Sequence, residues 1–174
     1  HEFHHALQLG AYGFWSDAEL YFMEMTSTWM EDIVYDDVND YYQYLSNDPG
    51  SISSQFSRPD LRFTRSNHSI EYSRSVWGKF IEQRYSRDVM RRAWEYVRQY
   101  TSLTALDHAL SEYGSSFREA FLEYAYWNLN TGPASDTVRF YREGRHYPQI
   151  YITPPTANYL PPESSFSDSI QAIS

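Results

Sequence analysis

Apolar residues recur at every third or fourth position from Ser16 to about Glu143. This spacing places them on one face of an α-helix, so it predicts helices that bury a stripe of side chains. Of the 174 residues, 41% are apolar and 18% are aromatic, which is enough for the core of one globular domain. The sequence therefore predicts a mainly α fold and excludes disorder for most of the chain.

Glycine, proline, asparagine and serine divide the helical pattern into segments. Ser16 with Glu19, and Ser116 with Glu119, have the spacing of capping boxes at helix starts. Residues 49–66 show no period and are predicted to be a loop. The predicted helices are residues 1–9, 16–35, 36–45, 66–81, 87–97, 103–113, 116–127 and 135–143.

The two ends of the chain differ from its centre. Residues 149–153 have the composition of a short strand, and the residues after them are rich in proline and serine. The first residue is a histidine that already belongs to a helical pattern. We therefore expect a helical domain over residues 1–148, truncated at its N-terminus, and a strand with a Pro/Ser-rich linker over residues 149–174.

Acidic residues are concentrated at the start of the chain. The net charge is −9, and residues 1–60 contain 11 acidic residues and one arginine. Such a segment repels nucleic acid, so no nucleic-acid partner is expected, whereas a cation site is compatible with it. No stretch approaches the ~20 apolar residues that a membrane span needs. The chain has no cysteine, so histidines and carboxylates must hold any metal.

The first five residues form an H-E-x-x-H pattern on a predicted helix. His1 and His5 lie one turn apart on one face, so both imidazoles can bind one ion. Glu2 projects about 100° away around the helix, where a carboxylate can take a proton from metal-bound water. Glu24 is the predicted third ligand, because it lies among apolar residues on the next helix, which a short turn makes an antiparallel neighbour. The alternative is a surface helix with solvated charges.

Two segments resemble the gluzincin zinc metallopeptidases: H-E-F-H-H-A-L-Q at residues 1–8 and F-M-E-M-T-S-T-W-M-E-D at residues 22–32. More narrowly, they are similar to secreted bacterial metalloproteases that pair an H-E-[FY]-x-H-A-x-Q helix with a W-x-x-E-x-x-[AS]-x-W-x-E-D helix. The similarity extends to about residue 150. It implies a zincin-like pair of catalytic helices followed by a helical bundle. It also implies a sheet before the motif, β-sandwich domains after the chain, and an extracellular or cell-surface location.

The resemblance also implies roles for individual residues. His1, His5 and Glu24 would bind Zn²⁺. Glu2 would be the general base in the hydrolysis of a peptide or protein substrate. Because the expected sheet would hold the substrate backbone, full activity is expected of a longer chain that contains this one.

Four further residues are candidates for supporting roles. A metal-bound histidine usually donates its second nitrogen to a carboxylate or carbonyl. Glu31 and its neighbour Asp32 could accept that bond, the alternative being a solvated acidic helix end. Tyr72, or else His68, could stabilise the oxyanion of the reaction, the alternative for a tyrosine being ordinary packing. The histidines expected to be structural are His4, His108 and His146.

Oxygen ligands suitable for Ca²⁺ also gather in the sequence, although without the spacing of an EF-hand loop. The alternative for them is helix capping and solvation. The residues concerned are Glu31, Asp32, Asp36, Asp37, Asn39 and Asp40.

Two other functions stay open at this point. The first is a non-catalytic protein- or glycan-binding module, in which zinc only pins two helices together. The second takes His1 as a mature N-terminus that chelates copper through its amine and imidazole. The oxidative polysaccharide enzymes that bind copper in this way are β-sandwiches, and the helical pattern disfavours that fold.

Overall fold

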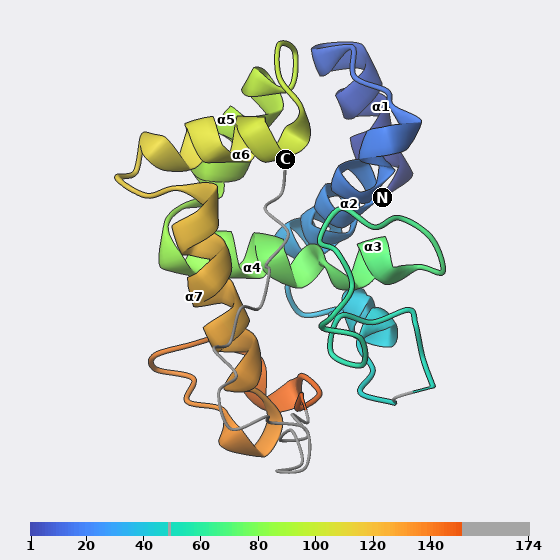
Figure 1. Cartoon of the computed structure of the whole chain (residues 1–174). Coiled ribbons are helices and arrows are strands. Elements are labelled where there is room, and N and C mark those ends of the chain that lie inside the picture. Colours follow the sequence, from blue (N-terminus) through green and yellow to red (C-terminus); the bar gives the residue numbers. More distant parts are fainter. Residues whose placement is uncertain (49, 151–174) are drawn as a thin grey trace, which may run out of the picture.

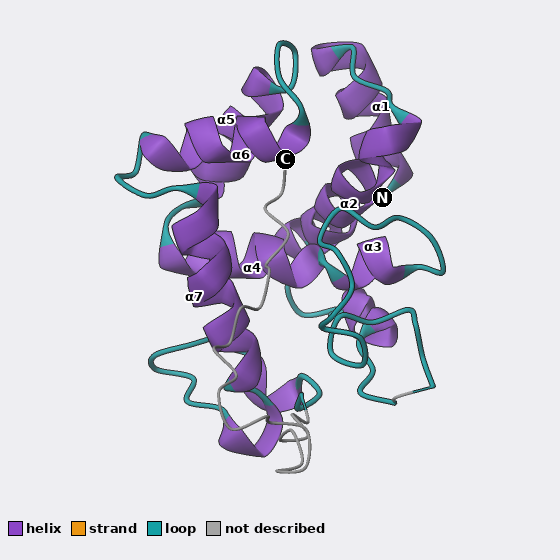
Figure 2. Ribbon diagram, in the orientation of Figure 1, coloured by secondary structure: helices purple, strands orange, loops and turns teal. Residues whose placement is uncertain are grey.

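The structure is a computed structural model that describes residues 1–48 and 50–150. Within these residues the chain forms seven α-helices, four short 3₁₀ helices and no strand, so the predicted mainly α fold is confirmed (Figures 1 and 2). The α-helices are α1 (Glu2–Tyr12), α2 (Leu20–Val34), α3 (Ile70–Ser73), α4 (Ser75–Arg84), α5 (Arg87–Tyr96), α6 (Ser102–Ser111) and α7 (Phe117–Leu129). The 3₁₀ helices are η1 (Asp17–Glu19), η2 (Asp40–Tyr44), η3 (Gly132–Ala134) and η4 (Gly144–His146). No helix in the described part of the chain is long and apolar enough to cross a membrane.

Helix α2 lies between α1 and α4 (Figure 1). It packs against α1, α3, α4 and η2, while α5 pairs with α6 and α7 packs against α4 and α6. From Tyr21 to Trp29 every residue of α2 is buried except Glu24, which is only half-buried. A carboxylate therefore reaches the surface from an otherwise buried helix.

Helices α2 and α4 approach each other closely at Gly78. A Cβ atom placed on Gly78 would lie 2.4 Å from Cγ of Trp29, closer than real Cβ contacts come. The missing side chain at Gly78 thus makes room for the indole ring. This contact fixes the position of α2, which carries Glu24, against the rest of the bundle.

Gly78→Ala is expected to destabilise the fold by about 1–3 kcal/mol, because overpacking forces the ring or the helices apart. Gly10→Ala is the matched control. Nothing lies within 4 Å of a Cβ at Gly10, and an alanine inside a helix is expected to stabilise by ~0.5–1 kcal/mol. Urea denaturation of both variants measures the two effects. A Gly78→Ala variant as stable as the wild type would contradict the close approach.

Serine caps begin two of the helices where the sequence predicts them. The hydroxyls of Ser86 and Ser116 each accept a backbone N–H from the first turn, at 3.1 and 3.2 Å. The capping box predicted at Ser16 is wrong, since its side chain makes no cap hydrogen bond. The carboxylate of Glu19 instead accepts the hydroxyl of Ser102, at the start of α6. A tertiary contact has taken the place of a local one.

Two predicted helices do not form as α-helices. Over residues 36–45 only the 3₁₀ helix η2 forms, directly after Asn39, which has a left-handed backbone with φ of 52°. Residues 135–143 form turns. Val138 in that segment is 94% exposed, whereas Tyr141 is fully buried, so single side chains reach the core and no continuous helical face is buried.

The helix predicted over residues 66–81 starts later and is broken. His68 and Ser69 have φ of 57° and 65°, so the helical backbone begins only after them. Arg74 separates α3 from α4. Its buried guanidinium donates to backbone carbonyls of the preceding loop, which ties the break to that loop.

The strand predicted over residues 149–153 is only partly within the described residues. Gln149 and Ile150 are in no regular element. The rest of the predicted strand and the predicted linker up to residue 174 lie outside the described residues.

Candidate metal centre

Helices α1 and α2 lie against each other in opposite directions. His1, at the start of α1, contacts Glu31 near the end of α2. Gln8, further along α1, contacts Met23 near the start of α2. The helix pairing therefore agrees with the one expected from the short turn, and it turns the H-E-x-x-H face of α1 toward α2.

His1, His5 and Glu24 converge on one point. Nε2 of His1 lies 2.9 Å, and Nε2 of His5 3.4 Å, from the same oxygen Oε2 of Glu24. One ligand atom of each residue lies within 4.8 Å of the other two. Two imidazole nitrogens and a carboxylate oxygen form a ligand set that Zn²⁺ takes in catalytic sites. The residues present thus fit a zinc ion.

The charges at this point suit a cation. Burial alone would raise the pKa of Glu24, but the hydrogen bond from His1 and the nearby imidazole of His5 hold that pKa below its usual range. The hydrogen bond with Glu24 in turn raises the pKa of His1, against the effect of burial. The carboxylate is therefore ionised at neutral pH, and a metal ion would compete with a proton for His1.

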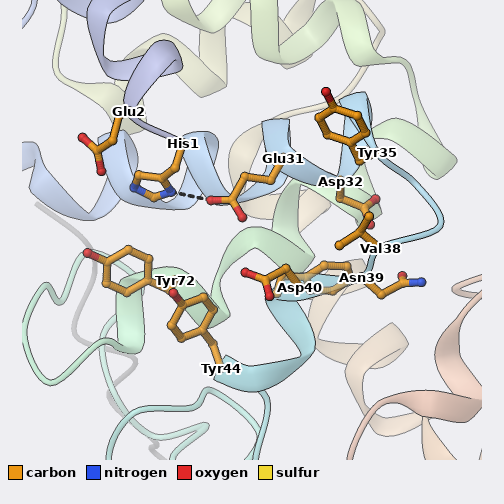
Figure 3. A pocket seen from close by; sticks show the side chains of 11 residues that line it. His1, Glu2, Glu31, Asp32, Tyr35, Val38, Asn39, Asp40, Tyr44 and Tyr72 are labelled. Atoms are coloured by element: carbon orange, nitrogen blue, oxygen red, sulfur yellow. Dashed lines mark hydrogen bonds and ion pairs between the residues drawn. The ribbon is translucent and has the colours of Figure 1, made fainter.

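Glu31 accepts a hydrogen bond from the ring nitrogen of His1 that faces away from Glu24. Its Oε1 lies 2.5 Å from Nδ1 of His1 (Figure 3). A carboxylate that accepts the Nδ1 proton allows Nε2 to exchange its own proton for a metal ion, which is the usual arrangement behind a metal-bound histidine. Asp32 differs from the prediction, because its Oδ2 lies 2.5 Å from Nζ of Lys79 and the structure gives it no contact with a ligand histidine.

The predicted catalytic residues fall in different places. Glu2 is exposed and lines a pocket together with His1 (Figure 3). The ring of Tyr72 lines the same pocket, with its centroid 5.8 Å from that of His1. Burial and the charge of Glu24 raise the pKa of Tyr72 to about 12, so its hydroxyl keeps a proton to donate. His68 is exposed in the loop before α3 and is not among the residues that line the pocket.

The pocket beside the site has a volume of about 580 Å³. This size lies in the range of pockets that hold small ligands or parts of larger ones. The rings of Tyr44 and Tyr72 stack, with centroids 4.9 Å apart, and form one wall (Figure 3). The lining residues are His1, Glu2, Glu31, Asp32, Tyr35, Val38, Asn39, Asp40, Tyr41, Tyr44 and Tyr72.

The other histidines have packing partners. His4 is buried between α1 and α2, and burial lowers its pKa to about 4, so it is neutral. His108 packs against Tyr100, and His146 stacks on Tyr42. Among the described residues, none of the three belongs to a group that could hold a metal.

A second group of carboxylates surrounds a lysine. Nζ of Lys79 lies 2.5, 3.6 and 3.4 Å from oxygens of Asp32, Asp36 and Glu143, respectively. Lys79 is the only lysine in the sequence, and its side chain is 6% exposed. The protein itself thus supplies a cation for these acids, and we do not propose calcium there.

Gln8 is a residue of the site that the sequence analysis missed. It is fully buried, and its Oε1 lies 2.7 Å from Nδ1 of His5. The sequence did offer one signal for this contact: Gln8 is three residues after His5, and residues three apart on a helix share a face.

Comparison of the chain with protein-family models, with curated proteins and with solved structures finds no match. The geometry of the site is therefore what supports a function.

Proposed function

We propose that the chain is a zinc-dependent endopeptidase of the gluzincin type, acting on peptides or proteins outside the cell or at its surface. The observation that carries the proposal is the convergence of His1, His5 and Glu24 on one point from two helices. The hydrogen bond from His1 to Glu31 supports it, because solvated surface histidines would need no such partner.

The arrangement suggests how a peptide bond would be hydrolysed. A zinc ion bound to the three ligands would polarise the scissile carbonyl and lower the pKa of the attacking water. Glu2 takes a proton from that water as its oxygen bonds to the carbonyl carbon. The same carboxyl group then passes the proton to the amine nitrogen as the C–N bond breaks. Tyr72 donates its hydroxyl proton in a hydrogen bond to the carbonyl oxygen as negative charge develops there.

Metal removal tests the proposal. Hydrolysis of an unfolded, fluorescently labelled protein is measured with this chain, and with a longer chain that contains it, before and after dialysis against a chelator. We expect hydrolysis to disappear and to return when stoichiometric zinc is added. Hydrolysis that survives complete metal removal would contradict the proposal. Bound zinc without hydrolysis in either chain would favour the non-catalytic module.

A further inference from the structure

We propose that Gln8 is a positioning residue for His5: its side-chain amide fixes the proton on Nδ1, so that the lone pair of Nε2 points toward the ion. The inference rests on the proposed zinc site and adds to it a residue that contacts no metal. It concerns a choice between two tautomers, since a neutral imidazole carries its proton on either nitrogen and offers a lone pair on the other.

The orientation of the Gln8 amide follows from its contacts. Nε2 of Gln8 lies 3.0 Å from the backbone carbonyl oxygen of Met23. A carbonyl oxygen can only accept, so the group facing it must be the NH₂ end of the amide. The hydroxyl oxygens of Thr26 and Ser27, at 3.2 and 3.0 Å, are further acceptors for the same NH₂ group. The flipped amide would set two carbonyl oxygens against each other.

This orientation determines the tautomer of His5. The oxygen Oε1 of Gln8 lies 2.7 Å from Nδ1 of His5, and an amide oxygen can only accept. Nδ1 must therefore carry the proton. On the neutral ring the lone pair is then on Nε2, the atom that lies 3.4 Å from the carboxylate of Glu24. Zinc binding would need no change of tautomer at His5.

The same amide connects two of the proposed ligands. Its oxygen holds the ring of His5, and its nitrogen holds the carbonyl of Met23, the residue directly before Glu24. Because Gln8 is fully buried, the two hydrogen bonds compete little with water. Gln8 accepts the Nδ1 proton of His5, as Glu31 accepts the Nδ1 proton of His1. Because an amide is neutral, Gln8 places no charge in the interior.

The tautomer can be measured in the wild-type protein without metal. Long-range ¹H–¹⁵N NMR of the His5 ring, well above the ordinary imidazole pKa of about 6.5, reports which nitrogen carries the proton. We expect the proton on Nδ1 in the wild type and a shift toward Nε2–H in Gln8→Met, which keeps the length of the side chain but lacks the carbonyl. A wild-type ring protonated on Nε2 alone would overturn the inference, whether or not zinc binds.

Zinc affinity gives a second readout. Gln8→Met is expected to bind zinc about 10–100-fold more weakly, as is usual when a partner behind a metal-bound histidine is lost. Gln8→Glu keeps an acceptor for Nδ1 and should recover part of the affinity. Thr26→Val is the matched control, because it disturbs the same buried contacts but leaves Oε1 on His5, and it should bind zinc like the wild type.

The outcomes separate this inference from the proposed function. If the wild type binds zinc and Gln8→Met binds it equally well with an unchanged tautomer, Gln8 only packs between the helices and the zinc site stands. If the wild type binds no zinc, the proposed function fails, and the NMR measurement still decides the role of Gln8. Should Gln8→Met fail to fold, the wild-type spectrum remains sufficient.

Discussion

Replacing Glu2 by glutamine is expected to lower peptide hydrolysis at least about a hundredfold, the low end of what general-base catalysis supplies. Glutamine keeps the shape of the side chain but cannot accept the proton of the attacking water. Zinc content and melting temperature should stay near wild type, because Glu2 is exposed beside His1 and is not one of the converging ligands. Steady-state hydrolysis at equal zinc content is the measurement.

Asp40→Asn is the matched control for this substitution. Asp40 lines the same pocket and also has an exposed carboxylate, so the change removes the same charge from the same pocket. It should retain most of the hydrolysis. Equal losses in the two variants would mean that the charge of the pocket matters and not a base at Glu2. Unchanged hydrolysis in Glu2→Gln would exclude Glu2 as the base.

Zinc is also expected to stabilise the fold, because its ligands come from both α1 and α2. At a free zinc concentration about a hundred times the dissociation constant, the gain in unfolding free energy is about 2.7 kcal/mol. For a chain of this size, that corresponds to a rise in melting temperature of roughly 5–10 °C. Glu24→Gln should remove this response, since it takes away the charge of the shared carboxylate. Calorimetry with and without zinc measures the shift in melting temperature of the wild type and of Glu24→Gln.

His68→Ala is the control for the zinc response. His68 is exposed and lies outside the pocket, so the variant should gain the same stability from zinc as the wild type. A Glu24→Gln variant that still responds fully would show that zinc binds somewhere other than at Glu24.

The sequence predicted those parts of the site that helical geometry determines. His1 and His5 are one turn apart, and Glu31 lies two turns after Glu24, so each pair shares a face before any tertiary contact forms. The short turn between the helices was enough to place these faces together. Asp32 was assigned wrongly, because its partner Lys79 is distant in sequence and only the packing of α4 brings the two together.

The role of Gln8 could not be derived from spacing alone. Its spacing from His5 indicates a shared face, but the direction of its amide depends on the carbonyl of Met23 in another helix. The missed helix boundaries have a similar cause. The pattern over residues 36–45 is helical, yet Asn39 adopts a left-handed backbone that no periodicity reveals.

The metal content of the purified protein tests the zinc site most directly. Elemental analysis of the wild type, of His5→Ala and of His68→Ala is carried out after equilibration with zinc and removal of the free ion. We predict close to one zinc ion per chain in the wild type and in His68→Ala, and almost none in His5→Ala, provided that circular dichroism shows each to be folded. A folded His5→Ala variant that holds as much zinc as the wild type would contradict the proposed site.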